Sequence, residues 1–151
     1  MARADGIRES LARSDPFDRH VVSSILAIAA IEASVQARPF IECVGLEAGE
    51  LRSLCEQLRP GAQVPSGPGP QIDQQEQTLR DILWMNSAEA SVLELLISKM
   101  IARRSLRPNH LWQDLGLANR GELTALMERH FPRLASRNSQ DMKWKKFFYR
   151  M

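Results

Sequence analysis

The stretch PFDRHVVSSILAIAAIEASVQA, residues 16–37, decides the fold class of this chain. It follows a Ser-Asp pair and begins with proline, a combination that marks a helix start because a Ser or Asp side chain accepts hydrogen bonds from the first free amides. Its apolar residues, most of them within residues 21–31, cover most of a helical circumference. We therefore predict a central, buried helix that Pro39 ends, because the residue before a proline is disfavoured in helical geometry.

Four further segments carry apolar residues at helical spacings of three and four. They cover about residues 47–58, 71–106, 119–131 and 138–151. Within the second of these, Asn86 followed by Glu89 resembles a capping box, which predicts that one helix ends there and a new one begins at Ser87. Together the patterns predict an all-α protein of about five to six helices.

Length and composition are those of one globular domain. The chain has 151 residues, of which 44% are hydrophobic and 25% charged, which is typical of folded proteins rather than disordered or fibrous ones. Residues 60–70, PGAQVPSGPGP, contain four Pro and three Gly, so neither a helix nor a packed strand is expected there. We predict a single helical domain over residues 1–151, with residues 60–70 as a flexible linker or exposed loop between two halves.

The two halves contain a candidate internal repeat. GLEAGELRSLCEQLRP, residues 45–60, aligns with GLANRGELTALMERHFP, residues 116–132, after insertion of one residue. The alignment predicts two related helix-turn-helix halves, in which residues 38–44 and residues 109–115 form equivalent corners. A chance likeness between two amphipathic helices is the alternative.

Charge is distributed unevenly along a chain whose net charge is only +2. Residues 1–75 hold 7 Lys and Arg against 10 Asp and Glu, whereas residues 76–151 hold 13 against 8. A basic C-terminal half favours an anionic partner, although a solvated helix face explains most charge runs of this kind.

Two cysteines, Cys43 and Cys55, are too few and too widely spaced for a disulfide framework or a metal site of their own. Charged residues interrupt the N-terminus, so no secretory signal is expected, and the longest apolar run is shorter than the roughly 20 residues that cross a bilayer. We predict a cytoplasmic protein with two free thiols and no contact with a membrane.

The sequence contains no motif of a known catalytic mechanism. It has no GxSxG, HExxH, CxxC or Gly-rich phosphate loop, and we predict that the protein is not an enzyme. His20 and His130 are expected to be packed or capping residues. His110 and Asp114 are four residues apart, so a helical turn would place both on one side, as a metal pair or, with greater weight, as a hydrogen-bonded corner.

Cations near the C-terminus predict a surface for an anion or a partner. Guanidinium groups match tetrahedral oxygen geometry, against the alternative of an ordinary basic helix end. The candidates for oxyanion binding are Arg103, Arg104 and Arg107 together with His110. The segment KWKKFFYR, residues 143–150, mixes cations with aromatics as nucleic-acid surfaces do, but we favour an amphipathic helix with apolar side chains inward and lysines toward a partner. The residues concerned are Met142, Trp144, Phe148 and Tyr149 on the inner face, and Lys143, Lys145 and Lys146 as the partner surface.

Five motifs in the C-terminal half carry a resemblance to a known family. In order, they are HLWQDLGL, RGEL, RHFP, LASRN and DMKWKKFFYR, and the matching segment spans about residues 101–150. This segment resembles the nitrogen-fixation protein NifQ family. The residues that we take as the family signature are His110, Leu111, Trp112, Gln113, Asp114 and Trp144.

The resemblance implies a carrier or donor of molybdenum for biosynthesis of the nitrogenase iron-molybdenum cofactor, with nitrogenase cofactor assembly proteins as partners. It also implies a cluster of molybdenum, iron and sulfur held by four closely spaced C-terminal cysteines, which would follow the FFYR motif. Neither Cys43 nor Cys55 matches that group, and thiolates are the ligands that such clusters take. We therefore expect a truncated form that does not hold the cluster itself.

The alternative is a helical interaction module that binds a protein or a nucleic acid and has no role in metal traffic. Its basic C-terminal half would supply the binding surface. Of the two kinds of partner, we expect a protein rather than a nucleic acid.

Overall fold

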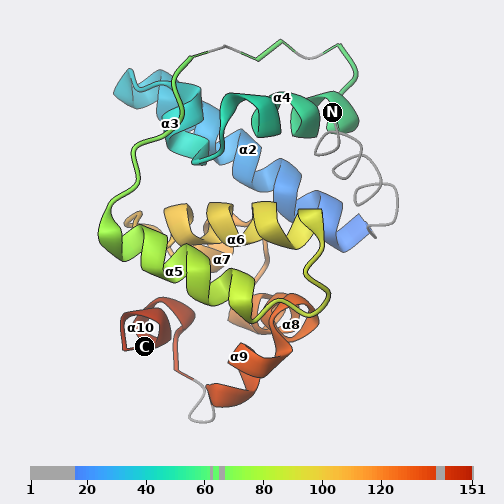
Figure 1. Cartoon of the computed structure of the whole chain (residues 1–151), viewed down its shortest axis with the longest axis vertical. Helices are drawn as coiled ribbons and strands as arrows, with labels where there is room; N and C mark the ends of the chain where they lie inside the picture. The colour runs from blue at the N-terminus through green and yellow to red at the C-terminus, as the bar shows by residue number, and fades with distance from the viewer. Residues whose placement is uncertain (1–15, 62, 65–66, 139–141, 151) are drawn as a thin grey trace.

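Nine helices and no strand are found in the part of the chain that the computed structural model describes, residues 16–61, 63–64, 67–138 and 142–150 (Figure 1). The helices are α2 (Pro16–Gln36), α3 (Phe40–Val44), α4 (Ala48–Leu58), α5 (Gln74–Met85), α6 (Val92–Arg104), α7 (Leu111–Asp114), α8 (Arg120–His130), α9 (Pro132–Arg137) and α10 (Trp144–Tyr149). The prediction of an all-α protein is confirmed. Five helices, α2, α4, α5, α6 and α8, have 11 to 21 residues, and the other four are short.

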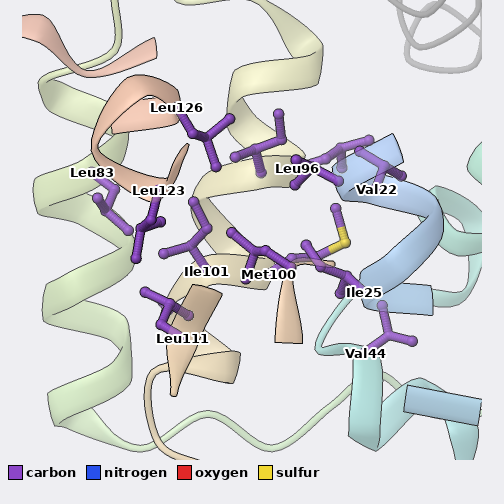
Figure 2. Close-up of a cluster of buried hydrophobic side chains, with 14 of the residues drawn as sticks. Val22, Ile25, Val44, Leu83, Leu96, Met100, Ile101, Leu111, Leu123 and Leu126 are labelled. Atoms are coloured by element: carbon purple, nitrogen blue, oxygen red, sulfur yellow. The ribbon is translucent and has the colours of Figure 1, made fainter. Parts of the chain in front are cut away.

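The centre of the fold is α6 rather than α2. Ten of the 13 residues of α6 are buried, and Figure 2 shows its Leu96, Met100 and Ile101 among apolar side chains from α2, α3, α5, α7 and α8. The buried face of α2 consists of Asp18, Val21, Val22, Ile25 and Ala29. Farther along α2, Ile31 and Val35 are 58% and 78% exposed. The helix predicted at residues 16–37 is confirmed as α2, but its predicted central place is wrong, because apolar residues around a helix are all buried only where neighbours cover every side.

The boundary between α5 and α6 is set by capping side chains. Ser91 Oγ accepts from the backbone N–H of Glu94 at 3.0 Å, and Oε1 of Glu94 accepts from the backbone N–H of Ser91 at 3.3 Å. This capping box starts α6 after Ser91, so the prediction of a box at Asn86 and a start at Ser87 is wrong. Asn86 instead ends α5, since its side-chain amide donates to the carbonyl oxygen of Ile82 at 2.8 Å.

The two predicted corners have the same local geometry. Gly45 ends α3 and Gly116 follows α7, and both have left-handed backbones, with φ of 84° and 71°. Pro39 and His110 directly precede α3 and α7, and their φ and ψ angles are −59° and 138° for the first and −63° and 138° for the second. Both pairs are related by the same offset of 71 residues (116 − 45 and 110 − 39), as the candidate repeat predicts.

Each corner packs against the long helix of the other half. The helix α3 contacts α6, and α7 contacts α2. A Cβ atom at Gly45 would lie 3.1 Å from Cβ of Arg103 in α6, and one at Gly116 would lie 2.0 Å from Oγ of Ser24 in α2. Glycine is thus required at these corners both for the left-handed backbone and for the close approach. The halves on either side of residues 60–70 are interlocked through their corners.

The C-terminal segment forms short helices. Pro132 begins α9, because proline fits the first helical position. The helix α10 covers only part of the segment 138–151 that was expected to be helical. Trp144 and Phe148 are buried, which confirms the predicted inner face at these two positions. Parts of the predictions fall on residues 1–15, 62, 65–66, 139–141 and 151 and on the side chain of Tyr149, all of which lie outside what the structure describes.

Candidate functional site

The signature residue Asp114 is buried against Arg104 in an ion-pair cluster. Arg104 is 0% exposed, and its Nε and Nη2 donate to Oδ2 of Asp114 at 3.1 and 3.0 Å. Its Nη1 and Nη2 also donate to the two carboxylate oxygens of Glu32, at 3.2 and 2.6 Å. Burial alone would lower the pKa of Arg104, but hydrogen bonds to Glu32 and the charge of Asp114 raise it. Arg104 therefore joins α2, α6 and α7 through charge-assisted hydrogen bonds.

His110 and Asp114 do not converge on a common ligand. Asp114 is 1% exposed and accepts from Nδ2 of Asn109 at 3.2 Å. His110 is exposed, and its ring stacks on Trp112 with 5.8 Å between centroids and 9° between planes. The interpretation as a hydrogen-bonded corner fits Asp114. Among the described residues, no group of three or more His, Cys, Asp or Glu side chains is placed to hold a metal ion.

The other signature residues build the corner and attach α10. Leu111 is part of the core (Figure 2), and Oε1 of Gln113 accepts from the backbone N–H of His110 at 3.2 Å. Trp144 is 3% exposed, and its Nε1 donates to Oγ1 of Thr124 in α8 at 3.1 Å. Most of the signature residues therefore stabilise the fold. His110, which is exposed, and Trp112, which is half-buried, remain at the surface.

Arg103 is also buried, and its guanidinium group forms hydrogen bonds inside the protein. Its Nε lies 3.0 Å from the carboxylate of Glu76, Nη1 donates to the carbonyl oxygen of Glu42 at 2.6 Å, and Nη2 donates to that of Gln71 at 2.8 Å. Glu76 in turn accepts from Nε of Arg80 at 2.8 Å. Arg103 and Arg104 are 4% and 0% exposed, so their predicted place on an anion-binding or partner surface is wrong, because buried carboxylates occupy both guanidinium groups.

Arg107 lies beside a cleft that sequence reasoning did not anticipate. The cleft has a volume of about 360 Å³ and is lined by Arg38, Glu42, Gln71, Ile72, Asp73, Glu76, Arg103, Leu106 and Arg107. Nε of Arg107 lies 3.3 Å from Oε1 of Glu32, which leaves its two terminal nitrogens without a protein partner among the described residues. The sequence did not identify Arg38 as a neighbour of Arg107, because Arg38 lies in the turn after α2, far from the other arginines in sequence. Its position in the first predicted corner was the one signal that could have indicated this.

The helix α10 and its two capping residues present a basic face, which we define as Lys143, Lys146 and Arg150. All three side chains are exposed, and their spacing of three and four residues places them on one side of the helix. Lys145 points elsewhere: its Nζ donates to the carbonyl oxygens of Arg107 and Asn109, and burial lowers its pKa. The predicted lysine surface therefore keeps Lys143 and Lys146, whereas Lys145 ties α10 to the corner.

His130 is a packed residue, as predicted. It is 8% exposed, with Nδ1 at 2.9 Å from Oε2 of Glu94 and Nε2 at 2.8 Å from Oδ1 of Asp18. It thereby links α8 to α6 and α2. His20 is exposed, and its Nε2 lies 2.7 Å from the carbonyl oxygen of Gly116, where it caps the second corner.

The two cysteines are separate free thiols. Cys43 is buried in α3 and Cys55 is half-buried in α4. Burial raises the pKa of both thiols, and for Cys43 the charge of Glu32 raises it further. Protonated, enclosed thiols are poor metal ligands, because the thiolate is the form that binds.

Within the described residues, no helix is long and apolar enough to cross a membrane.

Comparisons with known proteins identify the family. The family model described as NifQ matches residues 21–151. A NifQ homolog from Sinorhizobium fredii (strain NBRC 101917 / NGR234) is 37% identical over 143 residues, which cover 89% of this chain and 60% of that relative. NifQ from Rhodobacter capsulatus is 32% identical over 128 residues, 83% of this chain and 71% of the relative. NifQ from Klebsiella pneumoniae is 57% identical over 54 residues, 36% of this chain and 32% of the relative. No solved structure matches the chain.

The first two matches cover most of this chain but only part of each relative. The chain spans about 60% of the length of the Sinorhizobium relative. The family match begins in α2 and includes both corners, the ion-pair cluster of Arg104 and the whole of α10. The resemblance seen in the C-terminal motifs therefore extends through both halves, and the chain belongs to the NifQ family.

Proposed function

We propose that this chain is the helical body of a molybdenum carrier that serves nitrogen fixation, and that it docks on nitrogenase cofactor assembly proteins through the basic face of α10. Family membership supports the nitrogen-fixation role. The observation that carries the docking proposal is the pair of opposite faces on α10, one buried and aromatic, the other exposed and basic. The role is one of binding and delivery rather than catalysis.

Anchoring of α10 makes its basic face a defined surface. Trp144, Phe147 and Phe148 are buried, and Lys145 donates to two carbonyl oxygens of the corner that follows α6. The basic face is thus held in place before a partner arrives, which reduces the ordering cost of binding. Exposed charges at an interface chiefly steer encounter and select a partner of opposite charge, so the expected partner surface is acidic.

The ligands of the carried metal cluster are a separate question from docking. A cluster of molybdenum, iron and sulfur takes thiolate ligands, and this chain offers only Cys43 and Cys55, on different helices and with raised pKa values. These residues do not fit such a cluster. We therefore assign docking to this chain and propose no cluster ligand among its residues.

The docking proposal is tested by charge reversal. The variant K143E/K146E/R150E is compared with R52E/R59E/R137E, which reverses three exposed arginines on other elements. Each is titrated against purified nitrogenase cofactor assembly proteins at about 50 and 200 mM salt. We expect the α10 variant to bind at least about tenfold more weakly at low salt, mainly through slower association, and the control to bind like the wild type. Equal binding by the two variants would contradict the proposal.

Metal content tests the assignment of the cargo. The 151-residue chain is purified from cells supplied with iron and molybdenum, and both metals are measured per chain. We expect neither metal in stoichiometric amount. One molybdenum per chain would show that the cluster needs no further cysteines, and the variant H110A would then identify whether exposed His110 is a ligand.

Burial of the aromatic residues of α10 is our reason for preferring a protein partner to a nucleic acid. Nucleic-acid-binding surfaces stack bases on exposed aromatic rings, whereas Trp144, Phe147 and Phe148 are between 3% and 9% exposed. Titration with single-stranded and double-stranded DNA at two salt concentrations distinguishes the two functions. Tight binding with a steep salt dependence would favour the nucleic-acid module over docking on a protein.

A further inference from the structure

The cleft beside Arg107 contains cations whose hydrogen-bonding capacity is unused. Its volume is about 360 Å³, and both Arg38 and Arg107 line it. The side chain of Arg38 is exposed and makes no hydrogen bond within the described residues, and Arg107 has only its contact with Glu32. Each guanidinium carries five N–H donors, so most of these donors have no protein acceptor among the described residues.

The acidic side chains of the cleft are already engaged. The carboxylate of Glu42 accepts from the backbone N–H of Gln71 at 3.1 Å and from Nη1 of Arg103 at 3.3 Å. Glu76 binds Arg80 and Arg103, as described above. Asp73 caps α5 by accepting from the backbone N–H of Glu76 at 2.8 Å. Glu42 and Glu76 are thus paired with Arg103 and Arg80, while Asp73 caps α5 and keeps its charge. The guanidinium N–H donors that lack a protein acceptor among the described residues are those of Arg38 and the terminal nitrogens of Arg107.

Both arginines lower the pKa of the same carboxylate, that of Glu32. Although burial alone would raise the pKa of Glu32, that pKa is lowered, mainly by Arg104 and further by the charges of Arg107 and Arg38. Arg107 is held on both sides, because its Nε lies 3.3 Å from Glu32 and its carbonyl oxygen accepts from Lys145. Arg38 follows Ala37, which has a left-handed φ of 52°, and its backbone N–H donates to the carbonyl oxygen of Ala33 at 3.1 Å.

We infer that this cleft, between the end of α2 and the end of α6, binds a small tetrahedral dianion through Arg38 and Arg107. Planar guanidinium groups present paired N–H donors that match two oxygens of such an ion. The neighbouring Arg103 cannot turn to the ligand, because its three nitrogens are committed to Glu76, Glu42 and Gln71. The inference does not depend on the proposed carrier role or on the basic face of α10.

Calorimetric titration with sulfate, phosphate and molybdate tests the site. Ionic strength is held constant with sodium chloride, so that general screening does not imitate binding. The variants are R38Q, R107Q and the pair together, and the control is R52Q, which removes an exposed arginine from α4. We expect the wild type and R52Q to bind at least one of the three dianions, each cleft variant to bind it at least about tenfold more weakly, and the pair to show no binding.

R38Q keeps the test decisive if R107Q is destabilised by the loss of its contact with Glu32. The side chain of Arg38 makes no hydrogen bond within the described residues, so R38Q is expected to unfold at the same temperature as R52Q. Absence of binding by the folded wild type to all three dianions would overturn the inference. Equal affinity of R38Q and R52Q would overturn it as well. The order of affinity among sulfate, phosphate and molybdate then identifies the ion that the cleft selects.

Discussion

The Nε2 atom of His130 in α8 lies 2.8 Å from Oδ1 of Asp18 in the first turn of α2, 112 residues away. On the opposite side of the ring, Nδ1 lies 2.9 Å from Oε2 of Glu94 in α6. A protonated imidazole can donate to both carboxylates at once, whereas a neutral ring can donate to only one. The charge state of a single buried side chain therefore controls the connection between three helices.

This connection makes stability dependent on pH. Burial alone would lower the pKa of His130, but hydrogen bonds to Asp18 and Glu94 and the charges of these residues raise it. Because the folded state binds the proton more tightly, the stabilisation is complete below about pH 6.5 and is lost as the pH rises through the folded pKa. In urea unfolding at several pH values, H130Q is expected to lose this dependence, while H110Q, at an exposed position, keeps it. Parallel pH profiles for wild type and H130Q would contradict the assignment.

Removal of Arg104 is expected to be among the most destabilising single changes. R104A would leave the carboxylates of Asp114 and Glu32 without their shared cation in a buried setting, at a cost of about 3–5 kcal/mol. R107A is the matched comparison, because the side chain of Arg107 is partly exposed and pairs only with Glu32 among the described residues. Its cost is expected to be about 1 kcal/mol or less. Urea unfolding measures both, and equal losses would contradict a central role for Arg104.

The corner glycines differ from glycines elsewhere. Gly116 has a φ of 71°, and an added Cβ would lie 2.0 Å from Oγ of Ser24, so G116A is expected to cost at least about 1–3 kcal/mol. Gly49 in α4 has open space around it, and G49A should be neutral or stabilise the helix by up to about 1 kcal/mol. Thermal unfolding of the two variants gives the comparison. A tolerated G116A would mean that the second corner does not need its close contact with α2.

Anchoring and docking on α10 are separable. W144A is expected to lower the free energy of unfolding by about 3–5 kcal/mol, because it removes a buried aromatic side chain and its hydrogen bond to Thr124. K146E changes an exposed side chain and should alter stability by less than about 0.5 kcal/mol. Urea unfolding of both variants shows whether a loss of partner binding reflects the surface or the fold. Destabilisation by K146E as large as that of W144A would contradict the division of α10 into two faces.

The long helices could be predicted because apolar spacing and caps are local signals. The helix expected from about residue 119 is α8, and Oδ1 of Asn119 caps its start by accepting from the backbone N–H of Glu122 at 3.0 Å. The short helices α3, α7 and α9 have four to six residues, too few turns for a periodic pattern to identify them. The burial of α2 was overestimated for a related reason, since a run of apolar residues does not reveal which sides have neighbours.

Whether each arginine near the end of α6 is buried or exposed depends on partners far away in sequence. Arg104 pairs with Glu32, 72 positions earlier, and Arg103 with Glu42, 61 positions earlier. Nothing in the local run of arginines near the end of α6 distinguishes these buried residues from Arg107, which borders the cleft. The signature identified the family, but its most buried member, Asp114, serves the architecture, and the cleft with Arg38 could be found only once α2 and α6 were placed together.

The packing of both corners against both halves gives residues 60–70 a particular role. Because α3 contacts α6 as well as α2, and α7 contacts α2 as well as α6 and α8, each half supplies part of the core of the other. The loop then acts as a tether that raises the effective concentration of one half for the other, rather than as a hinge between independent units. A chain cleaved within this loop should remain assembled as a tight two-piece complex, and its pieces should unfold together or not at all.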